Sequence, residues 1–93
     1  MKLVFLPSTV ADVPWFRRYY RQVFPEGSET AREGLRRAQA LLAENPEIGQ
    51  PGEEPGTREL TIRRTPFAMI YRVLPDRIEI LRLLDQRSGG PRG

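Results

Sequence analysis

The sequence contains no cysteine and no histidine among its 93 residues. Without cysteine no disulfide bond can form, and without either residue type the usual zinc, haem and thiolate sites are excluded. We therefore expect neither a metal nor a cofactor. A chain of this length buries only about 60–65% of its unfolded surface, so a bound partner is the most plausible external source of stability.

Long hydrophobic runs are also missing. The apolar segment Leu3–Leu6 is far too short for a signal peptide core or a membrane span, and nothing later in the chain is long enough. We expect a cytoplasmic protein without a membrane partner.

Lysine is nearly absent, because Lys2 is the only one, and the other fourteen basic residues are arginines. Residues 1–56 carry seven basic and eight acidic side chains, whereas residues 57–93 carry eight arginines against four acids. A basic region suggests an acidic partner, either nucleic acid or an acidic protein segment. The alternative is an arginine-rich surface that only meets solvent.

The first half of the chain predicts a strand followed by a helix. Lys2–Leu6 is strand-like, and Pro7–Thr9 breaks it. Either the threonine or Asp12 caps the helix, in which Pro14 is tolerated in the first turn. Apolar residues then recur at helical spacing from Trp15 to Phe24.

A second helix is expected after the short Pro-Glu-Gly link at 25–27, which makes the two helices an antiparallel hairpin. Ser28 is a suitable cap, and Asn45-Pro46 stops the helix. Its apolar stripe follows spacings of four, three and four residues: Ala31, Leu35, Ala38 and Leu42. Residues 45–56 hold three prolines and three glycines and predict a loop.

Three strands are expected in the second half, at 57–64, 67–73 and 77–84, joined by connectors short enough for hairpins. The element order is then β-α-α-β-β-β. It predicts an α+β fold in which an antiparallel sheet carries a helical hairpin on one face. Residues 1–87 form a single domain, and residues 88–93, rich in glycine, form a flexible tail.

Local sequence resembles the RelE/ParE superfamily of toxins from type II toxin–antitoxin systems, over roughly residues 3–87. The first half contributes Trp15-Phe16, Tyr19-Tyr20, Phe24-Pro25 and the Asn45–Pro51 loop. The second half contributes its C-terminal pattern: Arg58–Ile62, Thr65–Phe67, Ile70–Val73, Ile78–Leu84 and Arg87.

The resemblance implies that a tightly bound antitoxin holds the protein inactive. RelE-like members enter the ribosome and cut mRNA, whereas ParE-like members inhibit DNA gyrase. The expected partners are a ribbon-helix-helix, ParD-like antitoxin and, as target, DNA gyrase. No direct sequence-specific nucleic-acid binding is expected of the toxin alone.

The nuclease groups of RelE-like members are mostly absent. Alignment through Tyr71 and Arg87 puts Glu59 and Thr61 where two lysines are expected, and Ala68 where a third-strand arginine is expected. Arg87 matches, but no tyrosine follows it. Asp85 stands where many relatives carry histidine, and arginine is a poor general base because it stays protonated.

The ParE-like branch is therefore favoured, and with it a protein inhibitor rather than an enzyme. Two alternatives stay open. One is a ribosome-dependent mRNA endoribonuclease, for which Glu59, Asp85 and Arg87 would be the catalytic candidates. The other is an inactive member that serves only in autoregulation with its antitoxin.

Arginines on or beside the strands are the candidates for target binding: Arg63, Arg72, Arg82 and Arg87. Strand alternation places Arg63 and Arg72 on the face of the sheet opposite the helices, where a partner can dock. The alternative is cross-strand ion pairing with Glu59 or Glu79.

Aromatic residues of the first helix are the candidates for antitoxin binding, since an amphipathic segment in a groove uses such anchors. The alternative is that they complete the core of a small domain. The expected contact residues are Trp15, Phe16, Tyr19, Tyr20, Leu35 and Leu42.

Overall fold

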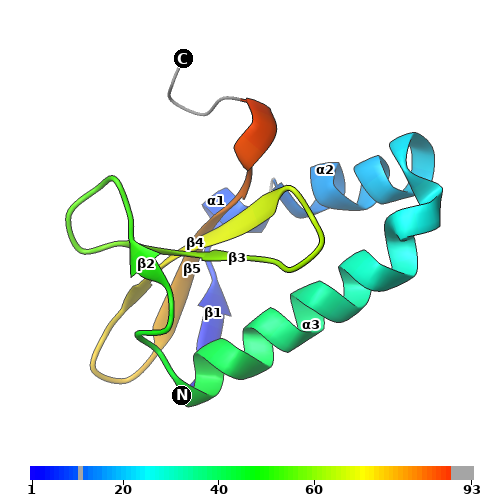
Figure 1. Cartoon of the computed structure of the whole chain (residues 1–93). Helices are drawn as coiled ribbons and strands as arrows, with labels where there is room; N and C mark the ends of the chain where they lie inside the picture. Colours follow the sequence, from blue (N-terminus) through cyan, green and yellow to red (C-terminus); the bar gives the residue numbers. More distant parts are fainter. Residues whose placement is uncertain (11, 89–93) are drawn as a thin grey trace.

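Strand β4, Phe67–Val73, lies at the centre of a five-stranded sheet of order β1-β5-β4-β3-β2. The computed structural model describes residues 1–10 and 12–88, shown in Figure 1. The other strands are β1 (Leu3–Phe5), β2 (Gln50–Pro51), β3 (Arg58–Thr61) and β5 (Ile78–Asp85). The expected bounds of β4 are confirmed, and β3 is shorter than predicted.

The sheet is mixed, so the expectation of a purely antiparallel sheet is wrong for one strand. β3, β4 and β5 form the predicted meander, but β1 pairs with β5 in parallel through Leu3↔Ile78 and Phe5↔Ile80. Residue alternation gives the faces of a strand but not its direction, and the long helical connection after β1 permits either. The α+β class with helices on one side is confirmed.

Strand β5 continues past the end of β1, and a short helix takes the place of the missing partner. Helix α1, Pro7–Val10, begins at the proline that was expected only to break a strand. The Ser8 hydroxyl donates to the Leu81 carbonyl and the Thr9 hydroxyl donates to the Ile80 carbonyl, both at 2.6 Å. The Leu81 carbonyl thereby gains a donor where β1 no longer reaches it, and the Ile80 carbonyl, which also accepts the Leu6 amide, gains a second one.

Asp12 has the same role rather than the expected one of a helix cap. Its Oδ2 accepts the Leu83 amide at 3.0 Å, and its two oxygens accept the Arg82 guanidinium at 2.8 and 3.0 Å. The Asp12 side chain is 12% exposed. It fixes the first residue of α2, Asp12–Arg18, against β5.

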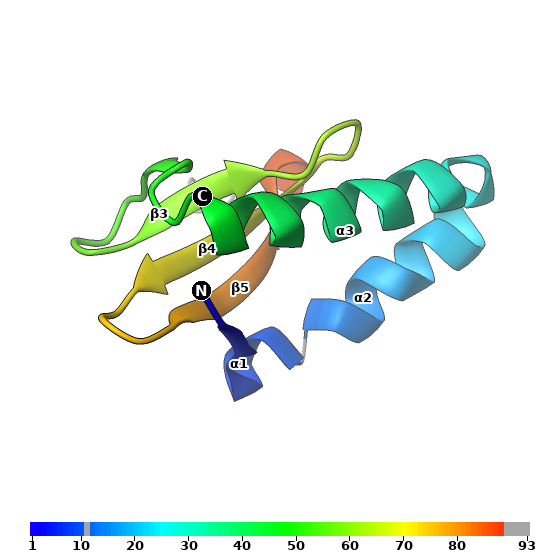
Figure 2. The same ribbon diagram turned by 90° about the horizontal axis from the view of Figure 1, so that it is seen from below.

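The helical hairpin lies on one side of the sheet, as Figures 1 and 2 show. Its first arm is α2 and the π-helical turn η1 (Tyr19–Val23), and its second arm is α3 (Ser28–Glu44). The 3₁₀ turn η2, Pro25–Gly27, connects them. Ser28 is the first helical residue and not the cap, whereas Asn45 ends the helix as expected.

Two close contacts hold α3 and the following loop to the sheet. A Cβ atom on Gly34 would lie 2.9 Å from the Arg63 carbonyl oxygen, so α3 approaches the β3–β4 turn more closely than any other residue would allow. The buried Tyr71 hydroxyl donates to the Pro46 carbonyl and accepts the Gly49 amide, each at 2.9 Å. The loop predicted at 45–56 is thus anchored, and β2 forms within it.

The chain ends, as far as described, in the 3₁₀ turn η3, Gln86–Ser88. Apart from the backbone of Ser88, the expected flexible tail 88–93 lies outside the described residues. Within residues 1–10 and 12–88 no helix is both long and apolar enough to span a membrane.

Replacing the buried carboxylate by Asp12→Ala should lower the free energy of unfolding by about 2 kcal/mol, because the Leu83 amide and Arg82 both lose their acceptor. The matched control is Asp76→Ala, which removes an exposed carboxylate paired with Arg77 and should cost less than about 0.5 kcal/mol. Urea denaturation measures both values. Equal losses would contradict the role given to Asp12.

Candidate partner-binding surface on the helical hairpin

Aromatic rings join the first arm of the hairpin to the sheet. The ring centroids of Phe16, Tyr19 and Tyr20 lie 4.9, 5.7 and 6.1 Å from that of Phe67. The Phe24 amide bonds to the Tyr19 carbonyl five residues earlier, so the turn is π-helical, and the adjacent Tyr19 and Tyr20 are both buried. Burial raises the pKa of the Tyr20 hydroxyl, which therefore stays neutral.

An open groove of about 730 Å³ runs between the two arms. Its apolar lining comes from both arms and includes Val13, Phe16, Tyr20, Ala31 and Leu35. Its charged lining consists of arginines, namely Arg17, Arg21 and Arg32, with no acidic residue from the part of the chain that the structure describes. The groove therefore suits an amphipathic segment with an apolar face flanked by carboxylates.

Three of the six residues predicted to contact an antitoxin line this groove: Phe16, Tyr20 and Leu35. Leu42 is fully buried, so its expected contact with a partner is wrong. Tyr19, Phe16 and Tyr20 all belong to the core around Phe67, with 9, 5 and 6% exposure, but Tyr19 does not line the groove. Trp15 is 40% exposed and packs edge-on against Tyr19, outside the groove lining.

Arg72 lies on the open face of the sheet as alternation predicted, but it is not free. Its guanidinium contacts the Glu79 carboxylate at 2.7 Å, and Arg77 contacts the other carboxylate oxygen at 3.0 Å. The hydrogen bond from Arg72 holds the pKa of Glu79 below its ordinary value. The cross-strand pairing considered as an alternative for Arg72 is therefore present.

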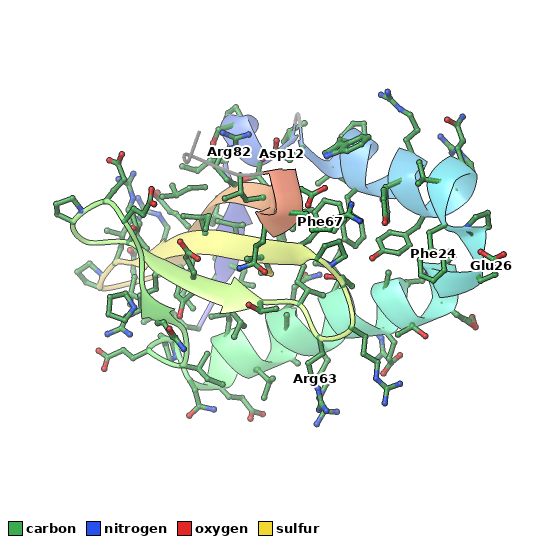
Figure 3. The ribbon with its side chains drawn as sticks, turned by 45° about the horizontal axis from the view of Figure 1, so that its top comes forward. Asp12, Phe24, Glu26, Arg63, Phe67 and Arg82 are labelled. Atoms are coloured by element: carbon green, nitrogen blue, oxygen red, sulfur yellow. The ribbon has the colours of Figure 1, made fainter. Side chains whose placement is uncertain are left out.

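Two further arginines predicted to bind a target are also engaged within the molecule. Arg82 is held by Asp12, as Figure 3 shows. Arg87 contacts Asp85 at 3.1 Å and donates to the Tyr19 hydroxyl at 2.9 Å, with its guanidinium carbon 4.9 Å from the centre of the Tyr19 ring. These contacts raise the pKa of both guanidinium groups and attach the end of β5 to the hairpin.

The expected position of Arg63 on the open face is wrong. Strand β3 ends at Thr61, and the turn that follows carries Arg63 to the side of α3. Figure 3 shows this side chain at the α3 side of the molecule, far from Asp12 and Arg82. The alternation of side chains between the two faces of a sheet holds only within a paired strand. Arg63 lies after Thr61, the last paired residue of β3, so alternation does not predict where its side chain points.

The candidate nuclease groups do not share one site. Glu59 pairs with Ile70 and Asp85 pairs with Phe67, and Ile70 and Phe67 project from opposite faces of β4. Asp85 and Arg87 lie on the face covered by the helices and contact one another. Among the described residues no group of three or more His, Cys, Asp or Glu side chains could hold a metal ion.

Sequence reasoning missed the arginines that rim the groove. Arg17 and Arg21 are four residues apart, a spacing that places them on one helix face, and neither is among the residues predicted to bind a partner. It also missed the contact of Asp12 with Leu83, because no local pattern indicates a partner 71 residues away.

Residues 3–89 match the family model of the ParE toxin of the parDE type II toxin–antitoxin system. A similar solved structure is that of the chromosomal ParDE toxin–antitoxin system from P. aeruginosa. It is 31% identical, with a TM-score of 0.70 over 89% of this chain and 92% of that chain. No match was found among curated proteins.

Replacing the open-face carboxylate by Glu79→Gln should flatten the loss of stability in acid. A lowered pKa means that the folded state favours the ionised group, so its contribution is complete above the ordinary glutamate pKa and is lost as the pH falls through the lowered value. We expect the melting temperature to fall less steeply from about pH 5 to about pH 3 in this variant. The control is Glu53→Gln in the exposed loop, and identical slopes in both variants would exclude the proposed linkage.

Proposed function

Because the chain belongs to the ParE toxin family of type II toxin–antitoxin systems, we propose that it stalls DNA gyrase by binding it. A ParD-like antitoxin with a ribbon-helix-helix domain neutralises the toxin in this proposal. Both proteins meet the toxin in the cytoplasm. The ParDE pairing of the family implies an antitoxin partner, whereas the target and the antitoxin class are our inference.

One observation carries the choice of inhibition by binding over RNA cleavage. Metal-free RNA cleavage needs a base, an acid and cations around one phosphate. Here Glu59 is on the open face of the sheet, while Asp85 and Arg87 are on the helical face and bonded to one another. The groups offered for catalysis therefore cannot act on a single phosphate without rearrangement of the sheet.

The interhelical groove is the proposed antitoxin site. Its apolar lining and its three arginines fit an amphipathic helix whose polar edges are acidic. Phe16, Tyr20 and Leu35 are the proposed anchors on the toxin.

The open face of the sheet and the end of β5 are the proposed gyrase surface. Arg72, Arg82 and Arg87 would contribute there by exchanging an internal carboxylate for one of the target. Such an exchange replaces one ion pair by another, so these residues are expected to contribute orientation more than affinity.

Inducing the toxin alone in bacteria should stop DNA synthesis before protein synthesis, as measured by pulse labelling, and the purified toxin should inhibit supercoiling by gyrase. Arrest of protein synthesis first, with cleaved mRNA, would instead support the ribosome-dependent nuclease. No effect on either process would support an inactive member that acts only with its antitoxin.

Placing a carboxylate in the groove by Leu35→Glu should weaken antitoxin binding at least about tenfold, since it buries a charge beneath the apolar face of the ligand. Ala40→Glu adds the same charge to an exposed position of α3 outside the groove and should bind as the wild type does. Calorimetric titration measures both affinities, and circular dichroism verifies folding. Equal affinity in both variants would exclude the interhelical groove as the antitoxin-binding site.

A further inference from the structure

A second groove, of about 640 Å³, lies on the other side of α3. One wall is the solvent-facing side of α3, including Glu29, Glu33 and Arg37. The other wall is the β3–β4 turn with Arg63 and Arg64. None of the residues predicted from sequence to bind a partner lies here except Arg63.

Four of the five arginines in this second groove, called the basic groove below, differ from those of β4 and β5 in having no acidic partner. Arg36 pairs with Glu33, but within residues 1–10 and 12–88 no ion pair is formed by its other arginines, Arg32, Arg37, Arg63 and Arg64. By contrast, Arg72, Arg77, Arg82 and Arg87 are all paired. Four arginines without an ion pair thus lie together along α3 and the β3–β4 turn, away from the paired arginines of β4 and β5.

The basic groove is rigidly built although its arginines are exposed. Gly34 leaves no room for a Cβ atom beside the Arg63 carbonyl oxygen, so α3 and the turn are closely packed and the distance between the two walls is fixed. The Thr65 hydroxyl donates to the Ile62 carbonyl at 2.8 Å and accepts the Phe67 amide at 3.0 Å, so the turn is closed on itself. Arg64 is held with a positive φ of 63°. A partner would meet preset positions and would order only the side-chain ends.

The two grooves are connected across α3. Arg32 lines both the apolar interhelical groove and the basic groove. A segment lying in the first can therefore continue over Arg32 into the second without leaving the surface. Arginines rim the first groove and form most of the charge of the second, so both select for negative charge along the same ligand.

The mixed charge of the basic groove favours a polypeptide over a nucleic acid. Glu29 and Glu33 stand among the arginines, and an unbroken row of phosphates would be repelled by them. A polypeptide can place carboxylates against the arginines and a neutral or basic side chain against the glutamates. The guanidinium group of arginine can also donate two parallel hydrogen bonds to one carboxylate.

We infer that the basic groove is a second docking surface, which takes an acidic polypeptide segment continuous with the one in the interhelical groove. The identity of that partner as the antitoxin rests on the proposed function, but the acidic chemistry of the segment does not. The antitoxin is then bound at two places, by apolar side chains on one side of α3 and by arginines on the other.

The test removes the two charges of the turn with Arg63→Gln and Arg64→Asn, because asparagine tolerates the positive φ at position 64. The control, Lys2→Gln with Arg18→Gln, removes two exposed charges outside both grooves. Affinity for the purified antitoxin encoded beside the toxin gene is measured by titration at several salt concentrations. A ten-residue glutamate-rich peptide and a duplex DNA serve as additional probes.

We expect the turn variant to lose between about threefold and thirtyfold in antitoxin affinity at low salt, with a shallower salt dependence, while the control stays within about twofold. The peptide should bind wild type and control but not the turn variant. Equal affinities in turn variant and control overturn the inference. So does loss of DNA binding with antitoxin and peptide binding unchanged, which would indicate a nucleic-acid surface.

The same experiment separates this inference from the proposed function. If wild-type toxin binds no antitoxin, the proposed function fails, and the peptide alone decides whether the groove takes acidic polypeptide. If Leu35→Glu weakens the antitoxin complex and the turn variant does not, the interhelical groove stands and the basic groove is excluded.

Discussion

Strand β5 extends beyond its neighbour β1, whose pairing ends at Ile80. The position of the helical hairpin depends on how the backbone of β5 finds hydrogen-bond partners after that residue. The Ser8 hydroxyl and the Asp12 carboxylate supply them at Leu81 and Leu83, and the Thr9 hydroxyl adds a second bond to the Ile80 carbonyl. Because these groups lie on α1 and at the start of α2, satisfying β5 also fixes where the hairpin begins. The aromatic residues of α2 and η1 then meet Phe67, and the groove between the arms follows from that placement.

The distribution of ion pairs separates two kinds of arginine with different consequences. Those on or after β4 and β5 are bound to Asp12, Glu79 and Asp85, so they stabilise the sheet and its attachment to the hairpin. Arg32, Arg37, Arg63 and Arg64, on α3 and the β3–β4 turn, form no ion pair within residues 1–10 and 12–88, so their charge is available. A high arginine content in the sequence therefore does not identify a binding face. One must first know which arginines form ion pairs with carboxylates of the same molecule.

Much of the fold could be predicted from the sequence where patterns are local. Alternation gave the bounds of β4, the stripe from Ala31 to Leu42 gave the buried side of α3, and Asn45-Pro46 gave its end. The failures involve distant partners. Thr9 and Asp12 looked like caps because a cap is the local use of such residues, while their real acceptor and donors are on β5. Arg63 was misplaced because the strand period was applied to a turn.

Site prediction followed the same division. Helical spacing identified Phe16, Tyr20 and Leu35, which do line the groove, but it could not distinguish them from Leu42, which lies about two turns after Leu35 and is fully buried. Only the packing of α3 against the sheet decides that Leu35 stays partly exposed while Leu42 is fully buried.

The pairing of β1 with β5 also affects the order in which the structure can form while the chain is synthesised. The contacts of Thr9 and Asp12 with β5 span about 70 residues of chain, and contacts of such separation form late in folding. A nascent chain carries β1, α1 and Asp12 out of the ribosome long before β5 follows. Until Leu83 emerges, Asp12 has no backbone partner on β5, so the start of the hairpin is not fixed and the groove is completed only with the last strand. An antitoxin that recognises the finished groove would therefore act on the completed toxin and not on its growing chain.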